Sequence, residues 1–302
     1  MEKYIPSKHS KSLILVTKYN WPVEVLLKGH AVVLFIDDLN SIPNIMRHKS
    51  DTINIHAFVH VNDLSSLETI DFKPEFFQGP LVLCINRLGK FSQVHHKIAM
   101  LRNMNVSVFF TGEERTATRD AQILSSLGIH SGIVLHKNAA LSDNVMDLMT
   151  YHFYGTLPHA PIEPFSTLEH LYDGTRHVTP AQAQLHDPTR YVFIDKDYHL
   201  AFSQGELDRG EYFDQGRDKL ATLSQHEAVE AQQTKWQEMF IESHPCTFCP
   251  AFRVCMGYFA EQSDNGRCQV VMSELLDAIE FSKKKNQNNQ NNKTFNSGQC
   301  RQ

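Results

Sequence analysis

Short apolar runs, rich in β-branched residues, recur through the first half of the chain. Each run has the length of a strand and is too continuous for a strand with one face in water. The pattern therefore predicts parallel strands covered on both faces. The last four runs begin about 25 residues apart, a spacing typical of a strand followed by a helix. The predicted strands are 13–16, 31–36, 53–59, 81–85, 106–110 and 132–135.

Helical periodicity lies between some of these strands. Segments 94–101 and 118–127 each place their apolar residues on one helical face, and Gly128 follows the second as a C-cap. Pro43 interrupts the short connection between the second and third strands, which argues against a regular crossover helix there. These alternating elements predict an α/β fold.

Three prolines between 157 and 164 predict a linker, because proline disrupts both helices and sheet ladders. We place a domain boundary there, with one unit over 1–160 and a second over 161–285. Segment 191–202 has the pattern of a β-hairpin, and helices are expected over 224–241 and 270–281. The Asn/Gln-rich tail, 286–302, is expected to be disordered.

Four of the six cysteines fall within one short stretch of the second unit. Cys246, Cys249 and Cys255 follow a Cys-x2-Cys-x5-Cys spacing, and Cys268 follows after twelve intervening residues. A Cys-x2-Cys pair places two thiolates on one tight turn, so that both can bind one metal centre. Four thiolates suit a [4Fe–4S] cluster or a tetrahedral zinc ion. Separate buried thiols or a disulfide pair are the alternatives.

Composition changes this interpretation little. The hydrophobic fraction of 41% and charged fraction of 21% are ordinary for a globular protein, and the net charge of -5 gives no indication of nucleic-acid binding. The polar N-terminus does not match a signal peptide, and no stretch approaches the length of a membrane span. We expect a cytoplasmic protein, and that reducing compartment favours metal ligation over disulfides.

A hairpin, then a helix, then Cys-x2-Cys-x5-Cys followed by Gly257 resembles the SPASM domain, found at the C-terminus of radical S-adenosylmethionine (SAM) enzymes. The first unit resembles the partial (β/α)6 barrel that precedes this domain. The resemblance is specific over 191–268 and only architectural before it. It implies a degenerate partial barrel over 1–160 and a small cysteine-ligated domain over 161–285.

Two departures from the family pattern qualify this resemblance. Radical SAM enzymes hold their S-adenosylmethionine (AdoMet)-cleaving cluster with Cys-x3-Cys-x2-Cys, but Cys84 is the only cysteine before residue 246. We interpret Cys84 as a core residue of a strand. The family motif also continues to a further cysteine, where this chain has Phe259. The family places another cysteine ligand in the second strand of the hairpin, but segment 200–203 of this chain contains no cysteine. The inner auxiliary cluster is therefore missing. Cys246, Cys249, Cys255 and Cys268 match the ligands of the outer one.

The pattern resembles pseudo-radical SAM proteins, which accompany true maturases in peptide-modification systems. The resemblance implies a non-catalytic accessory subunit that binds one [4Fe–4S] cluster, no AdoMet, and a radical SAM maturase, a ribosomal precursor peptide, or both. An electron-relay protein serving the maturase is the alternative. A third hypothesis, an enzyme with an unrelated site, lacks an assembled catalytic constellation in the sequence.

Other residues offer rival interpretations. His244 could replace Cys268, and the resulting three-cysteine, one-histidine set would suit zinc. The carboxylate pairs Asp37-Asp38 and Glu113-Glu114 follow strands but have no catalytic partner in the sequence. The aromatic residues around the cysteines predict an apolar jacket that excludes water from the metal. Cys300 lies in the polar tail and is not counted as a ligand.

Overall fold

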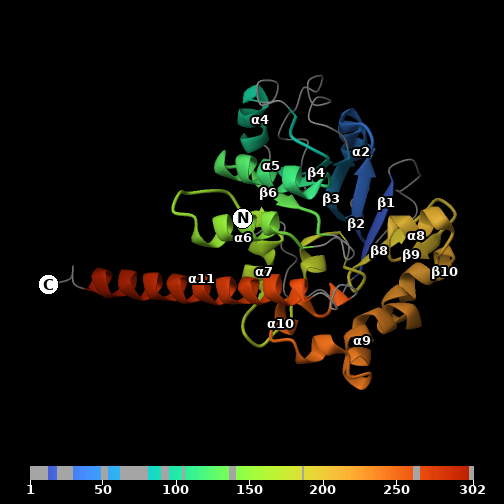
Figure 1. Cartoon of the computed structure of the whole chain (residues 1–302). Coiled ribbons are helices and arrows are strands. Elements are labelled where there is room, and N and C mark those ends of the chain that lie inside the picture. Colours follow the sequence, from blue (N-terminus) through green and yellow to red (C-terminus); the bar gives the residue numbers. More distant parts are fainter. Residues whose placement is uncertain are drawn as a thin grey trace.

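The protein is built around one ten-stranded sheet with helices packed against it (Figure 1). The strand order is β10-β9-β8-β1-β2-β3-β4-β5-β6-β7, and the pairs from β8–β1 through β6–β7 are all parallel. This computed structural model describes residues 13–18, 30–48, 54–61, 81–89, 95–103, 106–135, 141–185, 187–260 and 266–298. The α/β class predicted from the sequence is confirmed.

The strands are β1 (Ile14–Lys18), β2 (Ala31–Ile36), β3 (Asn54–Val61), β4 (Leu81–Ile85), β5 (Val106–Phe110), β6 (His130–Ile133), β7 (Ile162–Glu163), β8 (Tyr191–Ile194), β9 (His199–Ala201) and β10 (Asp214–Gln215). The α-helices are α2 (Ile42–His48), α4 (Ile98–Asn103), α5 (Glu114–Ser126), α6 (Asp143–Tyr154), α7 (Phe165–Leu171), α8 (Gln204–Arg209), α9 (Glu227–Ile241), α10 (Phe252–Cys255) and α11 (Arg267–Gly298). Short 3₁₀ helices are η1 (Leu39–Ser41), η4 (His95–Lys97), η5 (Pro180–Ala183), η6 (Arg217–Gln225) and η7 (Pro245–Phe248).

The continuous apolar runs form strands because both faces of the sheet are buried. Alternate residues of the strands belong to two separate apolar clusters, one on each face. The predicted strands 31–36, 81–85 and 106–110 match β2, β4 and β5 to the residue. The sixth strand begins two residues earlier than predicted, because His130 and Ser131 pair with β5.

The proline-rich segment does not separate two sheets. Within it, Ile162 and Glu163 form β7, which pairs in parallel with Ser131 and Gly132 of β6. The chain then returns to the far side of β1, where Tyr191 pairs with Ile14. The expected boundary near residue 160 therefore falls inside a continuous sheet, to which 161–285 contributes β7, β8, β9 and β10.

The predicted hairpin is confirmed as β8 and β9, with β10 added at the edge. Asp195 closes its turn, because Oδ1 accepts hydrogen bonds from the Asp197 and His199 backbone N–H groups at 2.9 and 3.0 Å. Tyr198 adopts a left-handed conformation, with φ of 64°. The Asp195 side chain offsets this local strain by satisfying two donors.

One apolar cluster joins the strands to the cysteine segment. On the helix-covered face, strand residues such as Leu83 and Val108 belong to the same cluster as Leu124 of α5. That cluster continues without a break into Val254 of α10 and Leu275 of α11. The two units predicted from the sequence therefore share a core. The opposite face holds a smaller cluster of strand residues, with Leu207 of α8 and Leu185 packed against it.

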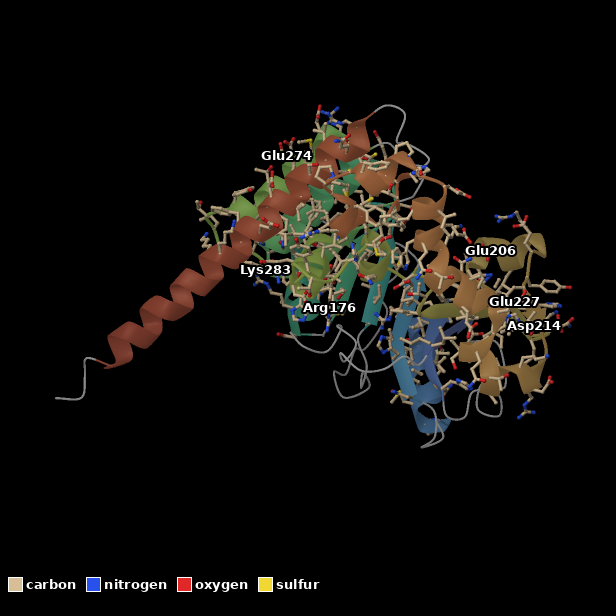
Figure 2. All side chains as sticks on the ribbon, turned by 90° about the horizontal axis from the view of Figure 1, so that it is seen from below. Arg176, Glu206, Asp214, Glu227, Glu274 and Lys283 are labelled. Atoms are coloured by element: carbon tan, nitrogen blue, oxygen red, sulfur yellow. The ribbon has the colours of Figure 1, made fainter. Side chains whose placement is uncertain are left out.

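α11 is longer than the helix predicted over 270–281. Its first half lies along the body, and it then projects beyond Lys283, as the two views in Figures 1 and 2 agree. The tail expected to be disordered, 286–302, thus begins inside this helix, whose backbone continues to Gly298. No proline or glycine interrupts 267–297, so nothing in the sequence stops the helix before Gly298. Within the described residues, no helix is long and apolar enough to cross a membrane.

Candidate functional site

The first two cysteines lie on one tight turn formed by η7. The ring of His244 precedes this turn, and its Nδ1 accepts a hydrogen bond from the Cys246 backbone N–H at 3.2 Å. Pro245 occupies the first position, where a missing N–H costs nothing. The Cys249 N–H then donates to the Cys246 carbonyl at 3.1 Å, which closes the turn. As predicted from the Cys-x2-Cys spacing, both thiols project from a single short segment.

A second turn follows Cys255, the last residue of α10. Met256 and Gly257 both adopt left-handed conformations, with φ of 49° and 72°. These two residues reverse the chain, so that the side chain of Phe259 enters the core and is 1% exposed. Glycine suits this reversal because it has no Cβ to clash in the left-handed region. The reversal leaves the Cys255 thiol buried beneath its own turn.

The fourth cysteine, Cys268, lies in the first turn of α11. Arg267 fixes this end of the helix to the start of α6, because its Nε donates to the Leu141 carbonyl at 3.2 Å and its guanidinium pairs with Asp143 of α6. Negative charge is favourable at a helix N-terminus, where backbone N–H groups are exposed. A thiolate is therefore easier to form at Cys268 than in mid-helix.

The four thiols lie close enough to affect one another's ionisation. Burial raises the pKa of the Cys246 thiol, and Cys268 and Cys249 raise it further. Burial also raises the pKa of Cys268, to which Cys249 adds. Burial raises the pKa of Cys255 to about 12; Cys246 and Cys268 contribute to the rise. Thiols that raise the pKa of their neighbours in partial burial form a site that a cation would stabilise.

Cys255 is the most buried of the four, yet its sulfur has polar contacts. Hydrogen bonding from the Phe259 and Tyr258 backbones opposes the rise in its pKa but does not cancel it. The Tyr258 N–H also donates to the Cys255 carbonyl at 2.9 Å. Backbone N–H groups near a sulfur are a recognised means of tuning an iron–sulfur cluster.

The cysteine sulfurs do not have the separation that a single zinc ion requires. A zinc–sulfur distance of about 2.3 Å in tetrahedral geometry separates sulfurs by about 3.8 Å. Among the described residues, the only group of three or more ligand atoms within 4.8 Å of one another is Asp195, Asp197 and His199. No three of the described cysteine sulfurs approach one another so closely.

The rival ligand His244 has one ring nitrogen engaged, since Nδ1 accepts the hydrogen bond from Cys246. A zinc site built on His244 would therefore use Nε2.

Cys84 lies in β4 on the smaller apolar face, and burial raises its pKa to about 12. This position fits the core role predicted for it. Cys300 lies outside the described residues.

The predicted apolar jacket is present in part. Phe259 and Phe252 are buried, and Met256 and Tyr258 are half-buried. Tyr258 also anchors the segment, because its hydroxyl donates to the Leu135 carbonyl at 2.9 Å, just beyond the carboxyl end of β6. In parallel α/β sheets, ligands gather at this edge. The cysteine segment therefore lies where the topology favours a functional site.

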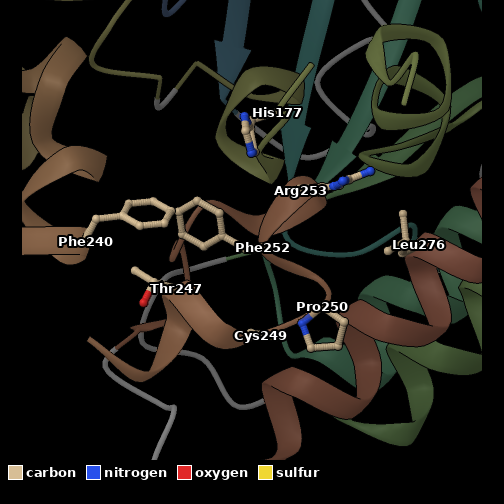
Figure 3. A pocket seen from close by; sticks show the side chains of 8 residues that line it. All are labelled: His177, Phe240, Thr247, Cys249, Pro250, Phe252, Arg253 and Leu276. Carbon is tan, nitrogen blue, oxygen red and sulfur yellow. The ribbon is translucent and has the colours of Figure 1, made fainter. Parts of the chain in front are cut away.

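A cavity of about 390 Å³ opens beside the cysteines (Figure 3). Cys249 contributes to its wall. The other lining residues are His177, Phe240, Thr247, Pro250, Phe252, Arg253 and Leu276. They come from the segment before η5, from α9, η7, α10 and α11, so local periodicity could not have predicted this cavity.

The Asp195, Asp197 and His199 group has a structural explanation. Asp195 Oδ2 lies 2.8 Å from His199 Nδ1, while Oδ1 closes the hairpin turn. His199 stacks on Tyr212, with ring centroids 4.1 Å apart. These contacts hold the β8–β9 turn together. Asp37, Asp38 and Glu113 follow their strands as expected, and Asp38 caps η1 by accepting from the Asn40 N–H.

The sequence did not predict a series of polar contacts at the amino ends of β5, β6 and β7. Ser107 Oγ lies 2.8 Å from His130 Nδ1, and His130 Nε2 lies 3.1 Å from Glu163 Oε1. Glu163 Oε2 accepts from the Thr167 N–H at 3.0 Å. The only sign of these contacts in the sequence is the presence of polar residues inside apolar runs. The contacts satisfy the hydrogen-bonding groups of the buried Glu163 and attach the two-residue strand β7 to the sheet.

Gly132→Ala should destabilise the protein by about 1–3 kcal/mol, the usual cost of overpacking. A Cβ at Gly132 would lie 2.7 Å from Glu163 Cβ and 2.9 Å from its carbonyl oxygen, so β7 must move. Gly205→Ala is the control: it lies in α8 and meets only the end of Arg209, so alanine should be neutral or slightly stabilising there. Urea denaturation measures both. Equal stability of Gly132→Ala and wild type would contradict the packing of β7.

Comparison of the chain with protein-family models, with curated proteins and with solved structures gives no match in any of the three. Fold and site together define the class: an α/β protein with a mostly parallel ten-stranded sheet and four coupled cysteines beside an open cavity.

Proposed function

We propose that this chain is a non-catalytic accessory subunit of a radical SAM peptide-maturation system. It binds one auxiliary-type [4Fe–4S] cluster through Cys246, Cys249, Cys255 and Cys268. The observation that carries the proposal is that the structure gathers four cysteines of residues 246–268 from η7, α10 and α11. Their proximity is reflected in the pKa of Cys246, which Cys268 and Cys249 raise, and in that of Cys255, which Cys246 and Cys268 raise. The chain would act in the reducing cytoplasm.

The topology supports a partial barrel for the first half. Strands β1 to β6 follow one another in order, all parallel, and α4, α5 and α6 contribute only to the apolar cluster of one face. Right-handed crossovers that always step in the same direction produce this arrangement. It is the arrangement of a barrel wall, with helices outside and strand residues inside.

Chain length supports a curved sheet. Gln184 donates to the Ile133 carbonyl of β6, and seven residues later Tyr191 begins β8. A flat sheet with six steps between β6 and β8 would separate them by about 29 Å. Seven residues reach about 25 Å only when fully extended, and the Gln184 side chain with its hydrogen bond adds to that reach. This segment instead contains a turn in which the Tyr191 N–H donates to the Asp187 carbonyl, which shortens it and favours an approach of the two strands by curvature.

The second half supports a SPASM-like unit with one cluster. The order of hairpin, α9, cysteine turns and α11 matches the family pattern predicted from the sequence. At the lost ligand positions the chain places packed apolar groups. Phe259 is buried in the main cluster, and Phe202 stacks on Phe213 with ring centroids 4.5 Å apart. Aromatic packing thus occupies the positions of the inner-cluster cysteines.

The four thiolates would complete the ligand set of a bound metal centre, which would leave no open position for substrate. When bound, the cluster supplies a cross-link between η7, α10 and α11, or an electron reservoir. Zinc is the alternative metal for the same residues. The chain's own groups screen the site: Cys255 is buried, and Phe259 and Tyr258 surround it and direct N–H groups at its sulfur.

The electron-relay function has one specific observation in its favour. Cys249 lines an open cavity and is half-buried, so a partner docked at this surface would approach within a short distance of the cluster. Reconstituted protein should then show a reversible one-electron reduction that the partner accelerates. Full partner activity with a cluster-free variant would remove the relay function.

The protein should not cleave AdoMet, because one cysteine before residue 246 cannot hold the cluster that binds and reduces it. Anaerobically reconstituted protein incubated with AdoMet and dithionite should yield no 5′-deoxyadenosine above a protein-free control. A radical SAM maturase with an intact Cys-x3-Cys-x2-Cys motif serves as the positive control. Formation of 5′-deoxyadenosine would contradict the accessory assignment.

The partner is tested through the neighbouring genes. We expect a maturase with Cys-x3-Cys-x2-Cys and a short precursor peptide to be encoded beside this chain. The purified chain should co-elute with that maturase or that peptide in size-exclusion chromatography. If all three coexist without any pairwise association, the accessory function is wrong.

A further inference from the structure

The cavity beside Cys249 has an aromatic wall built from three separate segments. The rings of Phe240 and Phe252 meet edge to face, with centroids 5.4 Å apart. His177 lies edge to face on Phe252 at 5.8 Å and stacks on Trp236 at 6.3 Å. Trp236 in turn meets Phe240 edge to face. Figure 3 shows His177, Phe240 and Phe252 around the cavity.

This wall continues onto an exposed apolar surface. Phe240 is 49% exposed, Ile241 is 83% exposed, and Phe248, next to the lining residue Thr247, is 79% exposed. Large apolar side chains that cluster on a surface mark a contact with another molecule. An enclosed small-molecule site would bury them. The arrangement therefore favours an extended ligand that places one side chain in the cavity and continues across the surface.

Arg253 gives the cavity a positive charge. Its guanidinium donates to the Gly174 carbonyl at 3.4 Å, and it pairs with none of the described acidic residues. Two acids on neighbouring segments are engaged elsewhere: Asp173 with Thr175 and Arg176, and Glu280 with the Tyr172 hydroxyl. In a chain of net charge -5, an arginine without an ion pair at an apolar cavity selects for a carboxylate.

The same charge excludes another ligand class. Aromatic walls can bind quaternary ammonium or methylated lysine groups through their π-faces. Here Arg253 lies within the lining and would repel such a cation, and no acidic residue lines the cavity to offset it. The volume of about 390 Å³ lies at the small end of ligand pockets and fits one large side chain with adjacent backbone.

We propose that this cavity docks a segment of the precursor peptide in which an aromatic or large aliphatic side chain lies beside a carboxylate. The apolar side chain occupies the space between Phe240, Phe252 and Leu276, and the carboxylate pairs with Arg253. This proposal rests on the accessory function above and names the part of the peptide that the chain recognises. Docking here would place the peptide against Cys249 and the metal centre.

Synthetic peptides test the proposal without knowledge of the natural precursor. The reference probe is acetyl-Gly-Phe-Asp-Gly-amide. Replacing its Phe by Ala, or its Asp by Asn, should each weaken binding about tenfold, since each removes one buried apolar group or one charge-assisted pair. Acetyl-Gly-Phe with a free C-terminal carboxylate distinguishes a chain-end carboxylate from a side-chain carboxylate. Affinities are measured by calorimetry on the full, metal-loaded chain.

Variants of this chain locate the contact. Arg253→Ala should weaken the reference probe about tenfold and leave the Asn-containing peptide unchanged, because the pair is already lost there. Arg176→Ala is the matched control: Arg176 is exposed and near the cavity but pairs with Asp173, so the affinity should not change. The ¹⁹F resonance of 5-fluorotryptophan at Trp236 should shift on binding, with a Trp21→Phe variant to assign it.

Three outcomes would overturn the proposal: no saturable binding of the reference probe, equal affinity for the Asp and Asn peptides, or no effect of Arg253→Ala. Binding that leaves the Trp236 resonance unmoved would place the peptide elsewhere and would also overturn it. These outcomes do not test the proposed function, which would be contradicted by the absence of metal or by the absence of association with a maturase. If the chain binds the cluster and its maturase but not the peptides, only the docking-site proposal is wrong.

Discussion

Cys255→Ala is expected to abolish binding of the proposed [4Fe–4S] cluster, lowering bound iron and sulfide from about four of each per chain to below about one. Cys255 is the most buried of the four cysteines, and the Phe259 and Tyr258 backbones oppose the rise in its pKa. No other described cysteine affects the pKa of these four thiols, so no other described cysteine is placed to replace Cys255 as a ligand. Metal analysis and the visible absorption of the anaerobically reconstituted protein measure the loss.

The controls are Cys84→Ala and Cys300→Ala, which should leave iron and sulfide unchanged. Cys84 is a half-buried residue of β4 on the other face of the sheet, where desolvation raises its pKa to about 12. Loss of metal in either control would make the ligand set wrong. Stoichiometric zinc without sulfide in the wild-type chain would keep the ligands and overturn the iron assignment.

Phe259→Ala should destabilise the whole chain by about 3–5 kcal/mol, the usual cost of truncating a buried aromatic residue. Phe259 is 1% exposed and lies in the apolar cluster that also contains Leu83 and Val108 of the sheet. Because one cluster joins both halves, we expect one cooperative unfolding transition. Phe248→Ala is the control: Phe248 is 79% exposed, and its loss should cost less than about 0.5 kcal/mol.

Hydrogen exchange distinguishes a shared core from two independent ones. In Phe259→Ala, protection should fall by similar factors in β4, β5 and α11, since all contribute to the same cluster. The sequence alone predicted a first half with its own core that would survive damage to the second. Full protection of β4 and β5 beside an exchanging α11 would restore that prediction.

Continuous apolar runs were sufficient to predict β2, β4 and β5 to the residue. Because both faces of these strands are buried, each apolar run begins and ends with the strand. The hairpin and α9 were also predictable, since turn residues and periodicity mark them locally. β7 was not, because two residues in a proline-rich segment carry no periodicity. Its place in the sheet depends on pairing with Ser131 and Gly132, far away in the sequence.

The sequence by itself determined the α/β class, the positions of most strands and a set of four cysteines at ligand spacing, because each depends on residues close together in the chain. Only the tertiary structure decided that one core joins the two halves and that an aromatic cavity opens beside Cys249. The physical reason is that burial patterns report whether a residue is covered but not by what. Long-range contacts decide which residues cover which. Examples are the hydrogen bonds from the Tyr258 hydroxyl to the Leu135 carbonyl and from the Val178 N–H to the Arg253 carbonyl.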